Sequence, residues 1–174
     1  MHAENINKNK DLRLLYVYEK VDQLSKKAKH LYNCKIQTNY NKIFSDKDVD
    51  IIFISSPTNT HIKFIEEGMK FKKTIFCEKP LDLNIDKIIN TFRKVKKLKP
   101  KIQLGFNRRY DPGHFSIKRD LKSKKIGKLE KIIITSRDPA PPSVSYLKNS
   151  GGLFRDMMIH CLLYTSDAAD DNAG

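Results

Sequence analysis

Three residues of this 174-residue chain have types and spacings that suit proton transfer: Lys79, Asp156 and His160. Lys79 follows the apolar segment 74–77 and stands before Pro80. Asp156 and His160 are four residues apart, which places two side chains side by side on one face of a helix. A histidine titrates near neutral pH and can act as a general base, and a lysine can stabilise charge that develops on an oxygen. Taken singly, however, a lysine after a strand is usually a surface charge, and a lone helical histidine is usually structural.

The first 105 residues alternate between strand-like and helix-like patterns. Apolar and aromatic runs predict strands at 12–18, 49–54, 74–77 and 101–105. Helical spacing predicts helices at 21–32, 60–70 and 84–97, with a loop containing Asn39 and Asn41 after the first helix. The first helix would bury one face, made of Val21, Leu24, Ala28 and Leu31. The run 49–54 suits a strand buried on both faces. The alternation predicts an α/β fold with a Rossmann-type, doubly wound parallel sheet.

This alternation ends after residue 105. Residues 113–124 could form a helix, and the partial alternation at 129–136 indicates a strand of a different sheet. Three prolines, at positions 139, 141 and 142, predict an extended loop. Ser150 can cap a helix that carries Phe154 through His160. This part reads as the start of an α+β substrate domain.

Glu19 closes the predicted second strand of a dinucleotide-binding sheet. An acidic residue there hydrogen-bonds the ribose hydroxyls of NAD and disfavours the 2′-phosphate of NADP. The alternative is a solvated turn residue without a ligand.

Composition and charge exclude some classes of protein and leave one open. The net charge of +14 requires a nucleic-acid partner to be considered, but the lysines are scattered and no basic cluster studded with aromatic residues accompanies them. No window has the roughly 18 apolar residues of a membrane span, and no secretory signal is visible. The three cysteines form no paired motif, which predicts a cytoplasmic protein without a metal site. We therefore expect neither a nucleic acid nor a membrane as partner.

Four motifs, in order and spacing, resemble the glucose–fructose oxidoreductase and inositol dehydrogenase (Gfo/Idh/MocA) family, and its inositol 2-dehydrogenase branch most. They are the segments 56–61 (SPTNTH), 77–80 (CEKP), 105–112 (GFNRRYDP) and 150–160 (SGGLFRDMMIH), and the proline-rich stretch 136–142 points the same way. The resemblance covers residues 1–160. It implies an NAD-dependent oxidoreductase that takes hydride from a secondary alcohol of a cyclic polyol or sugar, with myo-inositol, oxidised to scyllo-inosose, as the favoured substrate.

The resemblance also assigns roles to individual residues. Lys79, Asp156 and His160 match the family's catalytic positions, with His160 as base and Asp156 orienting it or binding a neighbouring hydroxyl. Arg109 is placed on the substrate side. The residues that border the cofactor are Ser56, Pro57, Asn59 and Glu78, in addition to Glu19. Pro80 fixes the backbone after Lys79, where a cis bond is one option. The full-length protein is expected to be a homo-oligomer.

The chain departs from the family pattern at both ends. No glycine-rich turn precedes the first helix, so the pyrophosphate of NAD lacks its usual anchor, and the first, central strand is missing. We expect residues 1–106 to be a partial NAD-binding domain and 107–160 to begin a substrate and oligomerisation domain. Met1 reads as an internal methionine, and residues 161–174 read as a translated sequencing adapter. The 174-residue chain is therefore expected to be inactive and poorly folded.

Other functions stay open at this point. A sibling within the family could act on another sugar or use NADP. A basic nucleic-acid-binding module and a relative without catalytic activity are the alternatives from other classes; the joint presence of Lys79, Asp156 and His160 argues against the second of them.

Overall fold

Five short parallel strands form the centre of the molecule, in two separate sheets. The computed structural model describes residues 1–125, 127–137 and 139–161. One sheet has two strands, β1 (Tyr16–Tyr18) and β2 (Lys35–Gln37). The other sheet, in the order β3-β4-β5, has three: β3 (Ile51–Ile54), β4 (Thr74–Cys77) and β5 (Ile102–Leu104). All pairings are parallel, which confirms the predicted α/β class.

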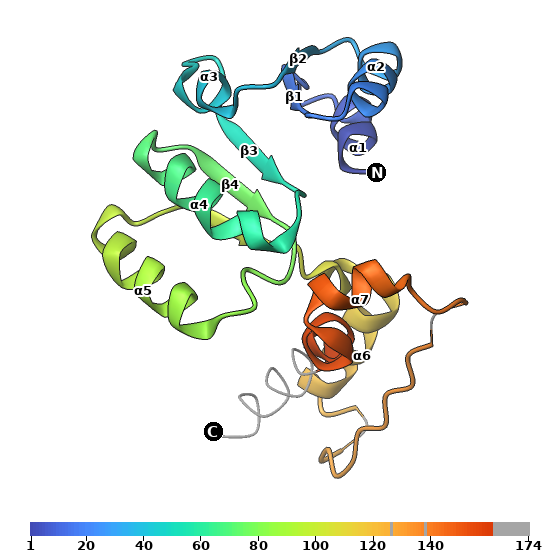
Figure 1. The fold of residues 1–174 in the computed structure, drawn as a ribbon. Coiled ribbons are helices and arrows are strands. Elements are labelled where there is room, and N and C mark those ends of the chain that lie inside the picture. The colour runs from blue at the N-terminus through green and yellow to red at the C-terminus, as the bar shows by residue number, and fades with distance from the viewer. Residues whose placement is uncertain (126, 138, 162–174) are drawn as a thin grey trace.

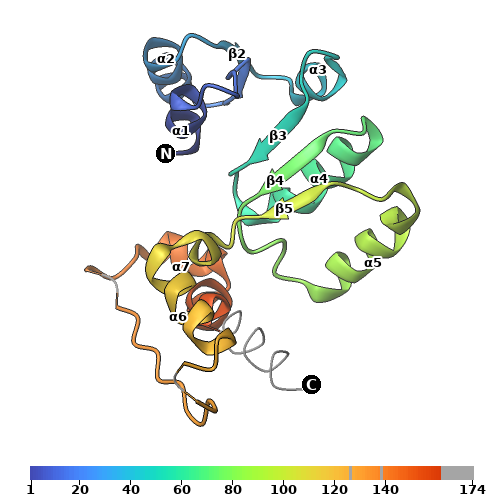
Figure 2. The same ribbon diagram turned by 180° about the vertical axis from the view of Figure 1, so that it is seen from behind.

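Helices connect the strands in the manner of βαβ units (Figures 1 and 2). The helices of this part are α1 (His2–Lys8), α2 (Asp22–Leu31), α3 (Tyr40–Ser45), α4 (His61–Lys70) and α5 (Ile85–Val95). Short 3₁₀ turns stand at Thr58–Thr60 (η1) and Lys96–Leu98 (η2). Thr60 directly precedes α4, and Asn84 caps α5 by accepting from the backbone N–H groups of Asp86 and Lys87. Both helix starts confirm the sequence prediction.

The core lies where α4 packs against β4. Ile65 of α4 and Ile75 of β4 are both fully buried. Gly68 permits this approach, because a Cβ atom there would lie 2.8 Å from Cδ1 of Ile75. Aromatic rings of Phe44 and Phe64 extend the core toward α3. Truncating a buried isoleucine of this kind to alanine typically costs about 2–5 kcal/mol of stability.

The second part of the chain is helical throughout its regular structure. It consists of η3 (Asn107–Tyr110), α6 (Pro112–Lys122), α7 (Val144–Ser150) and a π-helical turn η4 (Phe154–Met158). Asp111 caps α6 through the N–H of His114, with Pro112 at the first helical position, and Ser143 caps α7 through the N–H of Tyr146. These elements lie below the carboxyl ends of β3 and β4 in Figure 1.

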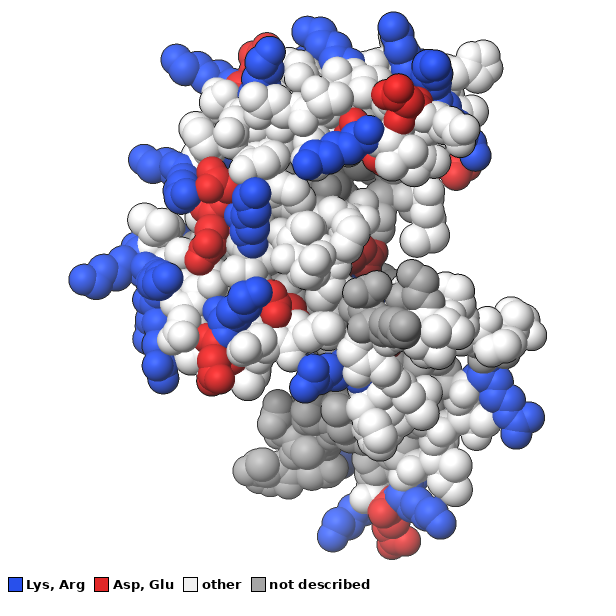
Figure 3. Space-filling model, viewed as in Figure 1, with Lys and Arg blue, Asp and Glu red and all other residues white. Residues whose placement is uncertain are grey.

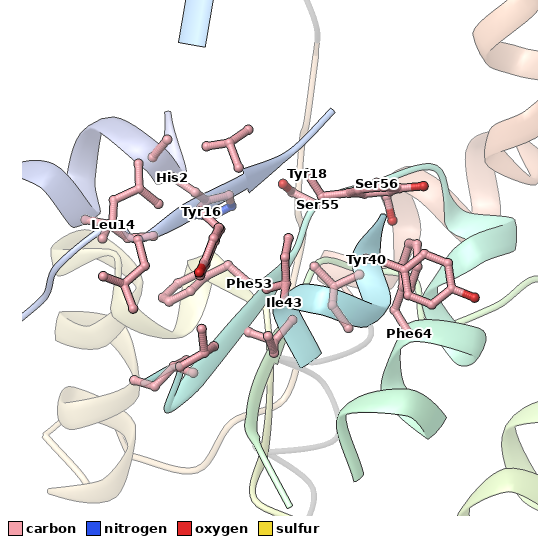
Figure 4. Close-up of a pocket in the computed structure, with 18 of the residues that line it drawn as sticks. His2, Leu14, Tyr16, Tyr18, Tyr40, Ile43, Phe53, Ser55, Ser56 and Phe64 are labelled. Carbon is pink, nitrogen blue, oxygen red and sulfur yellow. The ribbon is translucent and has the colours of Figure 1, made fainter. Parts of the chain in front are cut away.

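A cavity of about 880 Å³ separates the two sheets and runs between β1 and β3. Its walls include residues 12–20 on one side and 48–57 on the other. In Figure 4, Tyr16 of β1 lies beside Phe53, whereas the ring of Tyr18 packs against Tyr40 and Phe64. The doubly wound sheet order 3-2-1-4-5-6 has one further strand at this place. The facing edges of β1 and β3 are unpaired among the described residues.

The open edges predict association of the isolated 174-residue chain. Unpaired strand edges offer N–H and C=O groups to other chains, and Ile51 of β3 is 38% exposed. We expect the purified chain to form concentration-dependent aggregates, measured by light scattering from 1 to 100 µM at roughly neutral pH. A monomer that unfolds cooperatively over that range would contradict this expectation.

Several sequence predictions for the first part were wrong in detail. The expected strand 12–18 is regular only over Tyr16–Tyr18, and the expected loop around Asn39 contains β2 and α3, with Asn39 as the cap of α3. The predicted apolar face of α2 is not buried: α2 has no buried residue, because it flanks the two-stranded sheet only. The strand β3 is not fully buried: Ile54 is buried, whereas Ile51 is exposed, and the strand lines the cavity.

The second part also differs from the prediction. Residues 129–136 form no strand, and their isoleucines Ile132, Ile133 and Ile134 are exposed. No described strand lies alongside to pair with them, and pairing is what holds an extended run in a sheet. The helix α7 was not predicted. Ser150 ends it, and its Oγ accepts a hydrogen bond from the N–H of Gly152, so the predicted cap serves the following turn.

Candidate active site

Lys79 is carried to the carboxyl edge of the sheet by β4. The N–H of Glu78 donates to the carbonyl of Ile54 at the end of β3, and the N–H of Gly105 donates to the carbonyl of Cys77. These bonds continue the ladders past the last strand residues and fix the backbone beside Lys79. The Lys79–Pro80 peptide bond is cis. In open parallel sheets, ligands bind at this carboxyl edge.

Lys79 and Asp156 form an ion pair that joins the two parts of the chain. The Lys79 Nζ donates to Oδ1 of Asp156 at 2.6 Å and to the carbonyl of Asp156 at 2.9 Å. Both side chains are largely buried, at 19% and 14% exposure. Charge-assisted hydrogen bonds in such a setting are stronger than those between neutral groups. The sequence placed these residues 77 positions apart, and the structure brings them into contact.

Asp156 has a second partner that was not predicted. The Tyr146 hydroxyl, on α7, donates to Oδ2 of Asp156 at 2.8 Å. Burial alone would raise the pKa of Asp156, but the hydrogen bonds from Lys79 and Tyr146 outweigh it and the pKa is lowered. The carboxylate therefore stays ionised, with each oxygen engaged by a different donor.

His160 completes the cluster as a neutral imidazole at pH 7. Burial lowers its pKa, and the positive charges of Lys79 and Arg108 lower it further, against the opposing charges of Asp156 and Glu78. Its Nδ1 is buried without a hydrogen-bond partner in the described part of the chain. The two carboxylate oxygens of Asp156 contact Lys79 and Tyr146, and the negative charge of Asp156 also acts on His160.

A glycine turn brings the second part close to the Lys79 segment. Gly151 ends α7 with φ +83°, and a Cβ atom there would lie 2.6 Å from Cδ2 of Leu83. A side chain at this position would meet both backbone strain and Leu83, which follows Pro80 by three residues. Beyond the turn, Asp156 lies on the π-helical turn η4, a type of irregularity that is frequent at functional sites.

Two contacts hold the Glu78 side chain beside Lys79. His2 Nε2 lies 2.5 Å from Oε1 of Glu78, and the backbone N–H of Lys79 donates to Oε2 at 3.3 Å. Gly105 provides the space, because a Cβ atom there would lie 2.8 Å from Oε2. The His2 ring also packs edge-on against Phe76. Glu78 thus links the start of α1 to the end of β4.

The residues predicted to border a dinucleotide are only partly brought together. Glu19, Ser56 and Pro57 line the cavity between β1 and β3, whereas Asn59 lies in η1 outside it. Oε1 of Glu19 accepts from the backbone N–H groups of Lys20 and Val21, so the turn itself uses part of this carboxylate.

A dinucleotide fits part of this arrangement. Glu19 and Ser56 lie at the carboxyl ends of strands on opposite sides of the cavity, as a cofactor bound across a Rossmann sheet requires. A volume of about 880 Å³ lies within the usual range of ligand pockets. The described residues offer no glycine-rich turn for the pyrophosphate. The described residues therefore include candidate cofactor contacts on both sides of the cavity, but none of the usual backbone donors for the pyrophosphate.

The arginine pair after β5 stands in a short 3₁₀ turn. Arg108 and Arg109 both lie in η3, on the surface. The positive charge of Arg108 lowers the pKa of His160. Tyr146 and His2 were also missed by sequence reasoning. No signal pointed to Tyr146, because α7 was not predicted, and none pointed to His2, the first residue of α1.

Basic side chains are not gathered in one patch on the face of the molecule that Figure 3 shows. Figure 3 shows lysine and arginine spread over the visible face, with acidic groups among them. Among the described residues, no helix is long and apolar enough to cross a membrane, and no group of three or more metal-binding side chains is present.

Comparison with known proteins places this geometry in a family context. Residues 1–106 match the model of the GFO_IDH_MocA family, described as an oxidoreductase family with an NAD-binding Rossmann fold. The chain is 38% identical over 160 residues to inositol 2-dehydrogenase of Rhizobium meliloti, and 38% identical over 162 residues to myo-inositol 2-dehydrogenase of Thermotoga maritima. Each alignment covers 92% of this chain and 48% of the relative.

Solved structures agree with the sequence comparison. A crystal structure of a protein from Sinorhizobium meliloti, described as a putative myo-inositol dehydrogenase, superposes with a TM-score of 0.91 at 36% identity. A myo-inositol dehydrogenase from Corynebacterium glutamicum gives 0.88 at 36% identity. The superpositions cover 97% and 95% of this chain, and 51% and 50% of the other chains. The chain thus spans about half the length of the proteins that it matches.

Proposed function

Because the chain belongs to the GFO_IDH_MocA oxidoreductase family, as its motifs predicted, we propose that its gene product is an NAD-dependent polyol dehydrogenase. The observation that carries the proposal is the cluster of Lys79, Asp156 and His160 at the carboxyl edge of the sheet. The reaction is the oxidation of a secondary alcohol. Bound NAD supplies the acceptor for the hydride.

The residues of the cluster have separate tasks in this reaction. His160, neutral because its pKa is lowered, takes the proton of the substrate hydroxyl. Lys79 donates a hydrogen bond to the same oxygen and stabilises the negative charge that develops there. Asp156 holds the Lys79 ammonium in place, and Tyr146 holds Asp156. Lys79 and His160 thus act on the same substrate oxygen.

The cofactor would contact both sides of the cavity between β1 and β3. Glu19 would accept hydrogen bonds from the adenosine ribose, which favours NAD over NADP. Ser56, Pro57, Asn59 and Glu78 would border the cofactor at the ends of β3 and β4.

The favoured substrate is myo-inositol, oxidised to scyllo-inosose. Two relatives that are 38% identical carry the names inositol 2-dehydrogenase and myo-inositol 2-dehydrogenase. Arg109 would lie on the substrate side. We further propose that residues 1–106 form the NAD-binding part and 107–160 begin the substrate domain, in a cytoplasmic homo-oligomer. The proposed adapter-derived tail falls, from residue 162 onward, outside the described residues.

The proposal is tested with the protein expressed from its complete gene. NADH formation is followed with myo-inositol, scyllo-inositol and glucose, and with NADP in place of NAD. We expect turnover with NAD and an inositol, and at least about tenfold lower kcat/KM with NADP, because Glu19 repels the 2′-phosphate. Absence of turnover with any cyclic polyol would overturn the proposal.

The variant Tyr146→Phe should weaken the reaction without abolishing it. Loss of the hydroxyl removes one hydrogen bond to Asp156, which raises the pKa of that carboxyl and loosens its hold on Lys79. A hydrogen bond to a charged group is worth about 1.5 kcal/mol or more, so kcat should fall about tenfold. Steady-state kinetics measure this change, with Tyr32→Phe as the control. An unchanged kcat would show that Tyr146 does not act through Asp156.

The variant Arg108→Gln should shift the pH profile. Removing this positive charge raises the pKa of His160, so the base becomes protonated, and inactive, at higher pH than in the wild type. The acidic limb of kcat/KM should therefore move upward, by less than about one pH unit, because burial is the larger cause of the lowered pKa. Rates from pH 5 to 9 measure the shift against Arg93→Gln. A limb that stays in place or moves down would contradict the prediction.

A further inference from the structure

His2 touches the candidate site but has no part in the proposed reaction. It is the first residue of α1 and one of the residues that line the cavity between the two sheets (Figure 4). Its Nε2 lies 2.5 Å from Oε1 of Glu78, the residue before Lys79. The side chains of His2 and Glu78 are 24% and 29% exposed. The start of α1 thus contacts the backbone segment that carries the proposed catalytic lysine.

Two aromatic rings of the sheet hold the imidazole of His2. The ring of Phe76 lies edge-on to it, with the centroids 5.2 Å apart, and the ring of Phe53 lies at 6.2 Å. Phe53 and Phe76 are paired across β3 and β4, and their rings stack at 5.1 Å. A ring that packs against two others has already lost rotamer freedom, so its hydrogen bond to Glu78 requires little further ordering.

The Glu78 carboxylate passes this restraint on to Lys79. One of its oxygens contacts His2, and the other, Oε2, accepts from the backbone N–H of Lys79 at 3.3 Å. Gly105 leaves the room for Oε2, because a Cβ atom there would lie 2.8 Å from it. Without the contact to His2, the carboxylate could rotate away from this N–H. The backbone from which the Lys79 side chain reaches Asp156 would then lose one of its restraints.

The contact needs an N–H group at Nε2 of His2 and a carboxylate oxygen that accepts from it. A hydrogen on Nε2 is sufficient, so the ring does not have to be charged. The alternative is that His2 only fills space against Phe76. The two roles depend on different parts of the side chain, since the first requires the N–H donor and the second requires the ring.

We propose that His2 is a positioning residue that donates from Nε2 to Glu78 and thereby holds this carboxylate on the backbone N–H of Lys79. The effect on catalysis rests on the proposed function, whereas the contact between His2 and Glu78 does not.

Kinetics of the protein from the complete gene separate the donor from the ring. His2→Phe keeps a ring and lacks the donor, so kcat should fall about tenfold as the Lys79 backbone loses a restraint. His2→Gln loses the ring but keeps an N–H donor, so kcat should stay within about threefold of the wild type. His30→Phe, on the exposed side of α2, is the matched control.

The order of the two variants decides between the roles. A glutamine variant no faster than the phenylalanine variant would assign His2 a packing role and overturn the proposal. If His2→Phe does not fold, His2→Gln decides alone: a kcat near that of the wild type supports the donor, and a loss of about tenfold overturns it.

The contact itself is tested without turnover. His2→Phe, Glu78→Ala and the double variant are compared with the wild type by urea unfolding. We expect the two substitutions to be non-additive by about fivefold in the unfolding constant, because each removes the same hydrogen bond. Additive effects would overturn the contact, whether or not the protein oxidises a polyol.

Discussion

Replacing Lys79 with methionine should lower kcat of polyol oxidation by about 10³-fold. Methionine keeps most of the side-chain length but removes the ammonium that would stabilise charge on the substrate oxygen. It also leaves the Asp156 carboxylate with Tyr146 as its remaining donor among the described contacts, so the pKa of Asp156 rises. KM for NAD should change little, because the lysine acts on the alcohol.

Steady-state kinetics with saturating NAD measure this loss. Lys87→Met is the matched control, since Lys87 also forms an ion pair, with Asp82, but is mostly exposed and lies away from the cluster. Circular dichroism establishes that the variant is folded. More than about a tenth of wild-type kcat in a folded Lys79→Met protein would contradict the assigned role.

Replacing His160 with glutamine is expected to lower kcat/KM by about 10²- to 10⁴-fold and to remove the acidic limb of the pH profile. In the wild type, the pKa of His160 is lowered by burial and then by Lys79 and Arg108, so the ring is neutral at pH 7. Activity should fall as the pH drops through this lowered pKa, because the base becomes protonated. Glutamine does not titrate, so its residual rate should lose this dependence.

The control for this experiment is His114→Gln. His114 pairs with Asp111 at the start of α6, and the residue is not part of the cluster. Its replacement should leave both the rate and the pH profile unchanged. An acidic limb that persists unchanged in His160→Gln would assign the titration to another group.

The sequence predicted the elements that carry a strong local signal. Asn84 and the apolar periodicity behind it marked α5, and the run 74–77 marked β4, because a cap and a buried strand are both set by neighbouring residues. The motifs around Lys79 and Asp156 pointed to residues that are far apart in the chain and that the structure brings into contact. The resemblance to the family supplied the expected reaction and the roles of individual residues, which local patterns do not indicate.

Other features depend on contacts that no local pattern reveals. The consecutive isoleucines at 132–134 favour a strand, but no described strand lies beside them to pair with. The segment therefore stays irregular. The apolar stripe of α2 remains exposed because the sheet that it flanks has only two strands. Tyr146 reaches Asp156 only because the Gly151 turn folds α7 against the Lys79 loop. Long-range packing decided all three.

The proposed function depends on hydride transfer from a cyclic polyol to NAD at the cluster of Lys79, Asp156 and His160. The most direct measurement uses myo-inositol deuterated at the carbon to be oxidised, C2, with NAD and the protein from the complete gene, and analyses the NADH by mass spectrometry. We expect the wild type to form NADH that carries the deuterium, and Lys79→Met to form almost none. NADH without deuterium, or equal deuterium transfer by the Lys79 variant, would contradict it.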